Sequence, residues 1–341
     1  MKKVTIKDVA REAGVSIALV SRVLNAPLKE NGLPDCSVRD VTARRILNTV
    51  RYLGYHPNKA AVSLRKRLRR RLGVILPDIS NPFFADIARY LGEIARAHDY
   101  IVLLGNSDED PAKLSELAGA FLEDGVDGIV LTPGCACEEA VQGIVDQGLP
   151  VILTIRDIPS VRDAGKVLTN DALGTRLAID HLRSAGFERI DMLSTTLRYA
   201  NIEQRENLYL ERMQQEGLPA HVLHLDKDNR EESMKFILED ALRRGVRALF
   251  APNASLPLLC LQECRRSGVR IPQDIALMGH DGGELYRLTE PTITQIRYER
   301  RAIAEEAFSL FLEMLEDRTR IPEPRRLDPV LIPGKSTQSG N

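Results

Sequence analysis

The chain has 341 residues, of which 43% are hydrophobic and 28% are charged. This length and composition predict a soluble globular protein of two or three domains and exclude wholesale disorder. No window approaches the roughly twenty apolar residues of a membrane span, and no apolar signal core follows Lys2 and Lys3, so we expect a cytoplasmic protein.

The net charge of −1 hides a strong asymmetry along the chain. Residues 1–71 carry a net charge of +12, and the remaining residues carry −13. A basic head on an acidic body is typical of nucleic-acid binding at one end, because neutralised phosphates supply most non-specific affinity. The alternative is a solvated basic tail, and the apolar periodicity inside the head argues against it.

Two short helices joined at Gly14 are the first predicted elements. Thr5 and Asp8 can cap the first helix, and Gly14 supplies the left-handed residue that ends it. Ser16 can cap the second. We expect this second helix to bury Val20, Val23 and Leu24 and to expose Ile17, Ala18, Ser21 and Arg22. The pattern predicts a helix-turn-helix that places a helix N-terminus in a major groove, whereas two ordinary packed helices remain the alternative.

A loop rich in Pro, Gly and Asn follows, and then a third helix with apolar spacing from residue 38 to residue 53. Ser37 or Asp40 can start this helix, and Gly54 ends it. Residues 59–66 form a further helical segment that is too short to be stable alone in water. A basic run then reaches Arg71. We therefore predict a headpiece over 1–57, a hinge helix and linker over 58–71, and a core over 72–341.

Short apolar runs alternate with helical stretches from residue 72 onward. Buried strands are predicted at 72–76, 100–104, 128–131, 150–154, 189–194, 221–225, 247–251 and 275–279. Helices are predicted at 82–97, 111–124, 137–147, 173–185, 203–216, 230–244, 255–267 and 299–315, before a Pro-rich strand region at 321–333. This alternation is too long for one doubly wound sheet, so it predicts two α/β lobes with a cleft between them.

Motifs that would indicate catalysis or a resident cofactor are missing from the sequence. Cys36, Cys135, Cys137, Cys260 and Cys264 do not match zinc spacing, so we interpret them as free thiols and predict no metal site. No Gly-rich dinucleotide or phosphate loop and no nucleophile elbow occurs, so we predict neither an enzyme nor a cofactor. A transport protein that binds sugars would need a signal peptide and would lack the basic head.

Ordered motifs resemble the lactose-repressor (LacI/GalR) family of bacterial transcription regulators over nearly the whole chain. They include Thr5-Ile6-Lys7-Asp8-Val9-Ala10, Val20-Ser21-Arg22-Val23-Leu24-Asn25, Asp78-Ile79-Ser80-Asn81-Pro82-Phe83-Phe84, His181-Leu182 and Met278-Gly279-His280-Asp281. The resemblance implies an all-α head with a hinge helix and a periplasmic-binding-protein-like α/β core. It also implies a homodimer or tetramer on double-stranded, near-palindromic operator DNA.

The resemblance further implies a small ligand in the core cleft that changes the affinity for DNA. A sugar or sugar phosphate is expected as this effector, although a member that ignores small ligands or is regulated by a protein stays open. A repressor is the expected role. An activator uses the same DNA chemistry, and only the operator position distinguishes the two.

Candidate DNA-binding residues follow from the motif matches. Ile17 and Ala18 match positions that set base preference, and both can contact a thymine methyl but cannot form bidentate hydrogen bonds. Arg22 can pair with guanine, which would discriminate against other bases by ~1–3 kcal/mol. Phosphate contacts or helix caps are expected from Thr5, Ser16, Ser21 and Asn25.

The hinge segment carries the second set of DNA candidates. The leucine that matches Leu64 in the family wedges between base pairs from the minor groove; the alternative is an ordinary core residue. Asn58, Lys59 and Ala61 are further candidates in this segment. The loop over 26–37 is longer than the family's usual loop, which adds Lys29 as a possible contact and makes the third helix harder to place.

Candidate ligand groups lie at the inner edges of the two lobes by family resemblance. Asn81, Pro82 and Phe83 would form the mouth of the site, with Phe84 in the core. Arg205, Asn253 and Asp281 match ligand-binding positions at the ends of later strands, and Arg156 is a weaker candidate. A fork-shaped arginine facing a carboxylate suits vicinal hydroxyls. The alternatives are a solvated Arg205 and an Asp281 that caps a turn. Departures from the family pattern at Asn170-Asp171, Ala254 and Leu208 leave the effector open.

Overall fold

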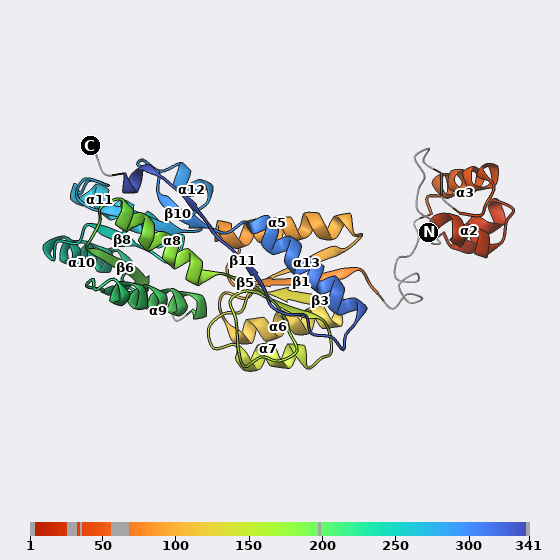
Figure 1. The fold of residues 1–341 in the computed structure, drawn as a ribbon. Helices are drawn as coiled ribbons and strands as arrows, with labels where there is room; N and C mark the ends of the chain where they lie inside the picture. The colour runs from red at the N-terminus through yellow and green to blue at the C-terminus, as the bar shows by residue number, and fades with distance from the viewer. Residues whose placement is uncertain (1–3, 26–32, 35, 56–67, 197–198, 339–341) are drawn as a thin grey trace. The chain divides into compact units, whose positions relative to one another are not determined.

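The computed structural model describes residues 4–25, 33–34, 36–55, 68–196 and 199–338 (Figure 1). The chain divides into two compact units, Met1–Arg69 and Arg70–Asn341, and each has its own apolar core. The division falls inside the predicted linker over 58–71. Most of that linker lies outside the described residues.

The N-terminal unit contains three helices around one small core. They are α1 (Ile6–Glu12), α2 (Ile17–Asn25) and α3 (Asp40–Leu53). Val9, Val20 and Ile46 are fully buried at the centre of this core. Gly14 and Gly54 both have a φ of 61°, so the left-handed residue predicted at Gly14 and the helix end predicted at Gly54 are both confirmed. Of the two predicted starts for α3, Asp40 is correct, and Ser37 lies before the helix.

The first lobe of the larger unit is built on a six-stranded parallel sheet. In spatial order its strands are β11 (Arg325–Leu327), β5 (Gly165–Thr169), β4 (Val151–Ile155), β3 (Gly128–Leu131), β1 (Arg71–Leu76) and β2 (Ile101–Asn106). Its helices are α5 (Pro82–Ala97), α6 (Pro111–Glu123), α7 (Glu138–Val145) and α13 (Arg300–Glu316).

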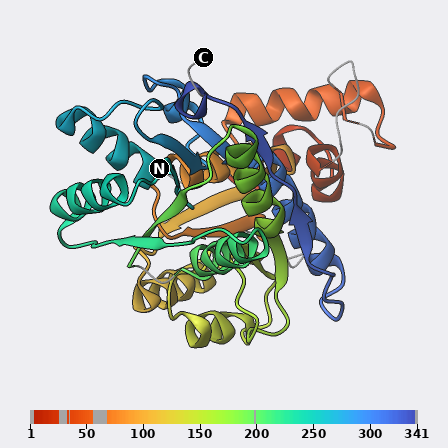
Figure 2. The same ribbon diagram turned by 60° about the vertical axis from the view of Figure 1, so that its left-hand side comes forward.

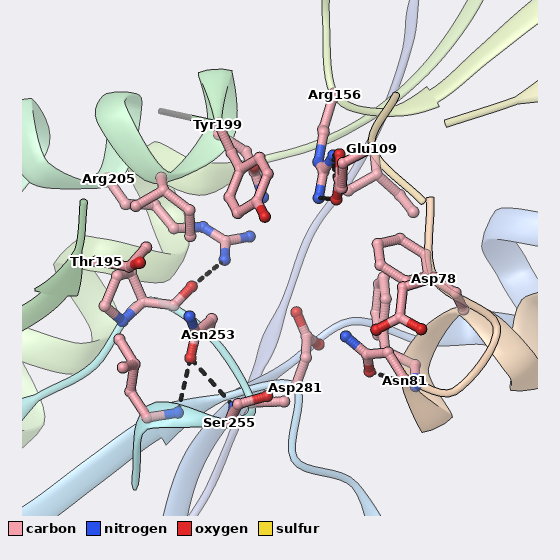
Figure 3. Close-up of a pocket in the computed structure, with 18 of the residues that line it drawn as sticks. Asp78, Asn81, Glu109, Arg156, Thr195, Tyr199, Arg205, Asn253, Ser255 and Asp281 are labelled. Carbon is pink, nitrogen blue, oxygen red and sulfur yellow. Dashed lines mark hydrogen bonds and ion pairs between the residues drawn. The ribbon is translucent and has the colours of Figure 1, made fainter. Parts of the chain in front are cut away.

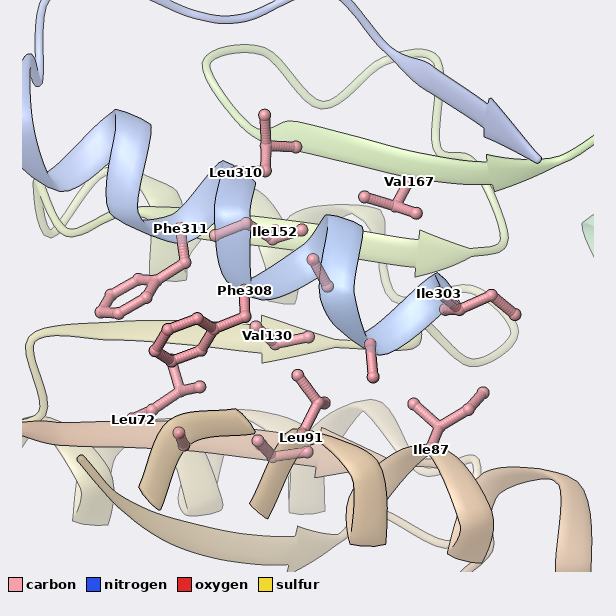
Figure 4. Close-up of a cluster of buried hydrophobic side chains, with 14 of the residues drawn as sticks. Leu72, Ile87, Leu91, Val130, Ile152, Val167, Ile303, Phe308, Leu310 and Phe311 are labelled. Carbon is pink, nitrogen blue, oxygen red and sulfur yellow. The ribbon is translucent and has the colours of Figure 1, made fainter. Parts of the chain in front are cut away.

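Helices cover both faces of this sheet, as the two views show (Figures 1 and 2). Helices α5 and α13 pack on one face, and α6 and α7 pack on the other. Phe308 and Phe311 of α13 point toward the strands, above Leu72 and Val130 (Figure 4). The helix comes close because Gly128 has no side chain: a Cβ there would lie 2.7 Å from the Phe311 ring. A segment near the end of the chain thus completes the core of the first lobe.

The second lobe repeats this architecture with one antiparallel edge strand. Its strands, in spatial order, are β12 (Val330–Ile332), β10 (Thr294–Arg297), β9 (Ala276–His280), β8 (Ala248–Phe250), β6 (Ile190–Thr195) and β7 (Val222–Leu225). Its helical elements are α8 (Asp171–Ser184), α9 (Ala200–Gln215), α10 (Arg230–Arg243), α11 (Leu256–Ser267), α12 (Glu284–Arg287) and the short 3-10 helix η1 (Lys335–Thr337).

Three segments cross between the lobes. The chain passes from β5 to α8, returns from β10 to α13, and passes again from β11 to β12. The predicted two-lobed α/β core is therefore confirmed. The sequence prediction missed β5 and β10, which are two of the strands that lead into these crossings. Within the described ranges, no helix has both the length and the apolar character to span a lipid bilayer.

Candidate functional site

Helix α2 of the N-terminal unit presents a short exposed surface at its start. The Ser16 hydroxyl accepts the Leu19 N–H at 3.2 Å and thereby caps the helix, as predicted. Ile17 is 44% exposed, and Ala18 and Arg22 are also exposed. Ser21 was predicted to be exposed but is half-buried. The exposed face of α2 therefore has the predicted mixture of apolar groups, Ile17 and Ala18 in the first turn, and a cationic group, Arg22 in the last turn.

The other head candidates make local contacts. Arg22 Nη1 donates to the Ser37 hydroxyl at 3.4 Å, so the arginine leans toward the residues that precede α3. Thr5 donates its N–H and its hydroxyl to the Asp8 carboxylate at 3.0 and 2.7 Å, so it closes the start of α1. The side chain of Asn25 is not among the described groups. Asn58, Lys59, Ala61 and Leu64 lie outside the described residues and remain predictions.

A cavity of about 270 Å³ lies between the two lobes of the larger unit. Residues that follow the carboxyl ends of strands in both sheets form its wall (Figure 3). Six of the predicted ligand residues are in this wall: Asn81, Phe83, Arg156, Arg205, Asn253 and Asp281. Pro82, also predicted at the mouth, begins α5 and is not part of the wall. Phe84, predicted to lie in the core, is buried there and also lines the cavity.

Arg205 is a buried, tightly held cation. Its side chain is 3% exposed, which excludes the alternative of a solvated helix charge. Nη2 and Nε lie 2.7 and 2.9 Å from Asp171 Oδ1, and Nη1 donates to the Pro252 carbonyl at 2.6 Å. Burial alone would lower the Arg205 pKa, but the Asp171 carboxylate raises it overall, so the guanidinium stays charged. Two of its five N–H groups have no partner among the described residues and remain available to a ligand.

Asp281 faces Arg205 across the cavity (Figure 3). Its Oδ1 accepts the Tyr298 N–H at 3.0 Å, and its Oδ2 lies 3.3 Å from His280 Nδ1. Burial and the nearby Arg205 charge lower the His280 pKa, so the imidazole is neutral and donates to Asp281. Burial would raise the Asp281 pKa, but the His280 bond and the Arg205 charge lower it overall. The carboxylate is therefore ionised and can accept hydrogen bonds.

Arg156 closes one end of the cavity by joining the two lobes. Nη1 lies 2.8 Å from Glu109 Oε2 and 2.9 Å from the Pro133 carbonyl. The Tyr199 ring, from the other lobe, lies against the guanidinium at 4.4 Å, and the Phe84 ring lies at 5.7 Å. Burial, followed by the Glu109 charge, raises the pKa of Tyr199 to about 12, so its hydroxyl remains protonated.

The two predicted asparagines also serve as helix caps. Asn81 Oδ1 accepts the Phe83 N–H at 3.0 Å, at the start of α5. Asn253 Oδ1 accepts the N–H groups of Ser255 and Leu256 at 3.1 and 2.9 Å, at the start of α11. These bonds fix the amide planes and use the oxygens, which leaves the NH₂ groups as donors toward the cavity.

Several other residues of the wall were missed from sequence. They are Asp78, Glu109, Ile155, Thr195, Tyr199, Asn201, Ile202, Leu225, Lys227, Arg230, Pro252, Ala254, Ser255 and Leu256. Many of them directly follow a strand of a parallel sheet. Ligands in open α/β sheets bind beyond the carboxyl ends of strands, so that position was the available signal.

Metal-binding clusters are not found among the described residues. The five cysteines, all within the described ranges, form no disulfide. Burial raises the pKa of the Cys137 thiol to about 11, so this group is a poor thiolate ligand or nucleophile at neutral pH.

Comparison with known proteins agrees with this arrangement. Residues 5–58 match the model for bacterial regulatory proteins of the lacI family, and residues 179–337 match a periplasmic binding protein-like domain. The catabolite control protein A of Priestia megaterium is 30% identical over 322 residues, which cover 93% of this chain and 94% of that protein. The ribose operon repressor of Bacillus subtilis (strain 168) is 30% identical over 346 residues, which cover 98% of each chain.

A solved structure shares the fold. The lac repressor dimer bound to operator and the anti-inducer ONPF aligns with a TM-score of 0.83 at 20% identity, over 99% of this chain and 100% of that chain. The two relatives at 30% identity extend over nearly the whole chain, so they include both the head and the two-lobed core. The chain therefore belongs to the LacI family of bacterial regulators, whose members are DNA-binding transcription regulators and not enzymes.

Proposed function

We propose that this chain is a homodimeric repressor of transcription whose affinity for a near-palindromic operator is controlled by a sugar or sugar phosphate in the cleft between the lobes. The family supplies the general role of a DNA-binding regulator. The operator, the effector and the sign of regulation belong to the proposal. Because the partner is chromosomal DNA, the proposed place of action is the cytoplasm.

The main support for a sugar effector is that Arg205 and Asp281 face each other across one cavity. A guanidinium with two available N–H groups donates, and an ionised carboxylate accepts. Vicinal hydroxyls both donate and accept, so a sugar can satisfy both groups at once. Relatives support this chemistry, since one is named a ribose operon repressor and a family member from Enterococcus faecium has a structure with bound ribose.

The exposed face of α2 supports the DNA-binding part of the proposal. Arg22 can form two hydrogen bonds to guanine O6 and N7, and Ile17 and Ala18 can contact thymine methyl groups. The proposed phosphate contacts are Thr5, Ser16, Ser21 and Asn25, with Asn58, Lys59, Ala61 and Leu64 acting from the hinge. Arg22 is thus the main polar reader of base sequence in α2.

Selection of bound duplexes from a random DNA pool tests the proposal. The full-length chain should enrich a sequence with two inverted half-sites, and a sugar should then change its affinity in fluorescence anisotropy. Asp281→Asn should keep operator binding and abolish the response to the sugar, while Asp274→Asn, in an exposed pair with Arg270, should keep both. Enrichment of no sequence, or an unchanged sugar response in Asp281→Asn, would contradict the proposal.

A further inference from the structure

We infer that the cleft selects an uncharged sugar over a phosphorylated one, because carboxylates of the protein already neutralise the buried arginines of its wall. This inference rests on the proposed function and deepens it by naming the charge class of the effector. The argument depends on which charges around the cavity have partners.

The positive charge of Arg205 is neutralised by Asp171, on the side away from the cavity. Its side chain and that of Asp171 are 3% and 2% exposed, and their closest atoms are 2.7 Å apart. Asp171 is not part of the cavity wall, so a ligand meets the arginine but not its carboxylate. The available N–H groups can donate to a hydroxyl, but the net charge of the pair is zero. A phosphate would therefore gain little from approaching it.

Arg156 is neutralised at the wall itself. Glu109 accepts from both terminal nitrogens of Arg156, at distances of 2.8 to 3.1 Å. The rings of Tyr199 and Phe84 lie against the same guanidinium. A phosphate needs an open edge with at least two N–H groups for bidentate binding, but Glu109 occupies the edge formed by Nη1 and Nη2, and Nε is buried.

Two further carboxylates, Asp78 and Asp281, line the cavity. Asp78 accepts the N–H and the hydroxyl of Ser80 at 2.9 and 2.6 Å, and Asp281 accepts from Tyr298 and the neutral His280. Among the described residues, neither carboxylate forms an ion pair with a lysine or arginine. Both can accept hydroxyl groups, and both would repel a phosphate dianion.

Two further cations, Lys227 and Arg230, line the cavity from the lobe that contains α10. Lys227 Nζ is 2.7 Å from Asp228, so its charge is also matched. Arg230, the first residue of α10, is exposed and forms no ion pair within the described part of the chain. A solvated charge of this kind is screened by salt and cannot offset the buried Asp281 carboxylate together with the half-buried Asp78 carboxylate. The volume of about 270 Å³ is small for a binding pocket, which suits a single sugar ring.

The test measures the binding of sugars and their phosphates to the full-length chain by thermal shift and calorimetry at fixed ionic strength. The probes are matched pairs: ribose with ribose 5-phosphate, glucose with glucose 6-phosphate, and fructose with fructose 6-phosphate. At least one free sugar should bind about tenfold or more tightly than its phosphate, which is the ratio expected from one added like-charge contact in a partly buried site.

A substitution that removes one charge from the cavity wall but keeps its shape tests the cause of the preference. Glu109→Gln keeps an oxygen for Arg156 but removes the compensating charge, so it should reduce the preference for the free sugar by about tenfold. Glu93→Gln makes the same change in an exposed pair with Arg89, at 2.8 Å, and should leave the preference unaltered.

The outcomes separate this inference from the proposed function. Tighter binding of a phosphate than of its parent sugar overturns the inference, while control by a carbohydrate stands. If that tighter binding is lost in Arg230→Gln, the exposed arginine is the phosphate site and the charge argument fails. No binding by any probe overturns both. An equal change in Glu109→Gln and Glu93→Gln also overturns the inference, because the preference would then follow total charge.

Discussion

Removing the Asp171 carboxylate should destabilise the larger unit strongly. Its Oδ1 accepts from Arg205 Nη2 and Nε at 2.7 and 2.9 Å, from the Tyr298 hydroxyl at 3.0 Å and from the Thr169 hydroxyl at 3.2 Å. All of these groups are buried, so water cannot replace the lost acceptor. Asp171→Ala therefore leaves an unpaired cation and two hydroxyls with fewer partners.

The magnitude follows from the burial of the pair. Breaking a buried ion pair by removing one partner costs about 3–5 kcal/mol, because the remaining charge is uncompensated. For a unit that extends from Arg70 to Asn341, this loss corresponds to a Tm lower by roughly 5–9 °C. Asp171→Asn should cost less, since the amide oxygen still accepts from Tyr298 and Thr169.

Helical circular dichroism during thermal and urea unfolding is the appropriate assay, because the chain contains no tryptophan. Asp180→Ala is the matched control: its carboxylate lies 2.8 Å from Arg212, but the side chains are 47% and 32% exposed, so the loss should stay below ~1 kcal/mol. A loss in Asp171→Ala no greater than in this control would refute the reasoning.

Arg22→Ala should weaken binding to the selected operator by about 1–3 kcal/mol and leave binding to random duplexes almost unchanged, as measured by anisotropy; an equal loss on both would reject its role as a base reader. His280→Asn should flatten the dependence of stability on pH. Burial holds the His280 pKa below its usual value, so the unfolded chain binds the proton first and stability falls as the pH drops below about 6.5, by up to ~1.4 kcal/mol per unit; an unchanged slope in unfolding titrations would contradict this. Gly128→Ala should cost about 1–3 kcal/mol in urea unfolding, since its Cβ would lie 2.8 Å from the Pro150 carbonyl, whereas Gly92→Ala, with open space around it, should cost nothing.

Much of the fold could be predicted from local patterns, and the exceptions have physical reasons. The apolar runs at β1 and β3 identified those strands almost to the residue. Strand β5 includes Lys166, and β10 includes Gln295, so neither forms a continuous apolar run. Helix α9 was expected to begin at residue 203 but begins at Ala200. Its N-cap, Tyr199, makes no side-chain capping bond, so the sequence contains no capping signal that would predict this start.

The candidate site, too, could be predicted only in part from the sequence. Residues that touch the cavity could be proposed because they follow predicted strands or match family motifs. The partners of these residues could not be predicted from the sequence, since Asp171 is 34 residues from Arg205 and Glu109 is 47 residues from Arg156. A local pattern carries no information about contacts at such separations. The electrostatic character of the cleft therefore emerges only from the folded chain.

The two groups that face each other across the cavity are anchored to the segments that cross between the lobes. Asp281 accepts the Tyr298 N–H at 3.0 Å, and its carbonyl accepts from Arg300 Nη2 at 2.8 Å, on the segment from β10 to α13. Arg205 is held by Asp171, on the segment from β5 to α8, and the Tyr298 hydroxyl joins the two segments through Asp171 at 3.0 Å. Arg205 and Asp281 both belong to the second lobe, so a change in the angle between the lobes moves them together, relative to Asn81 and Arg156 of the first lobe. A ligand that bonds to residues of both lobes resists that movement, so ligand affinity and lobe geometry are linked in both directions.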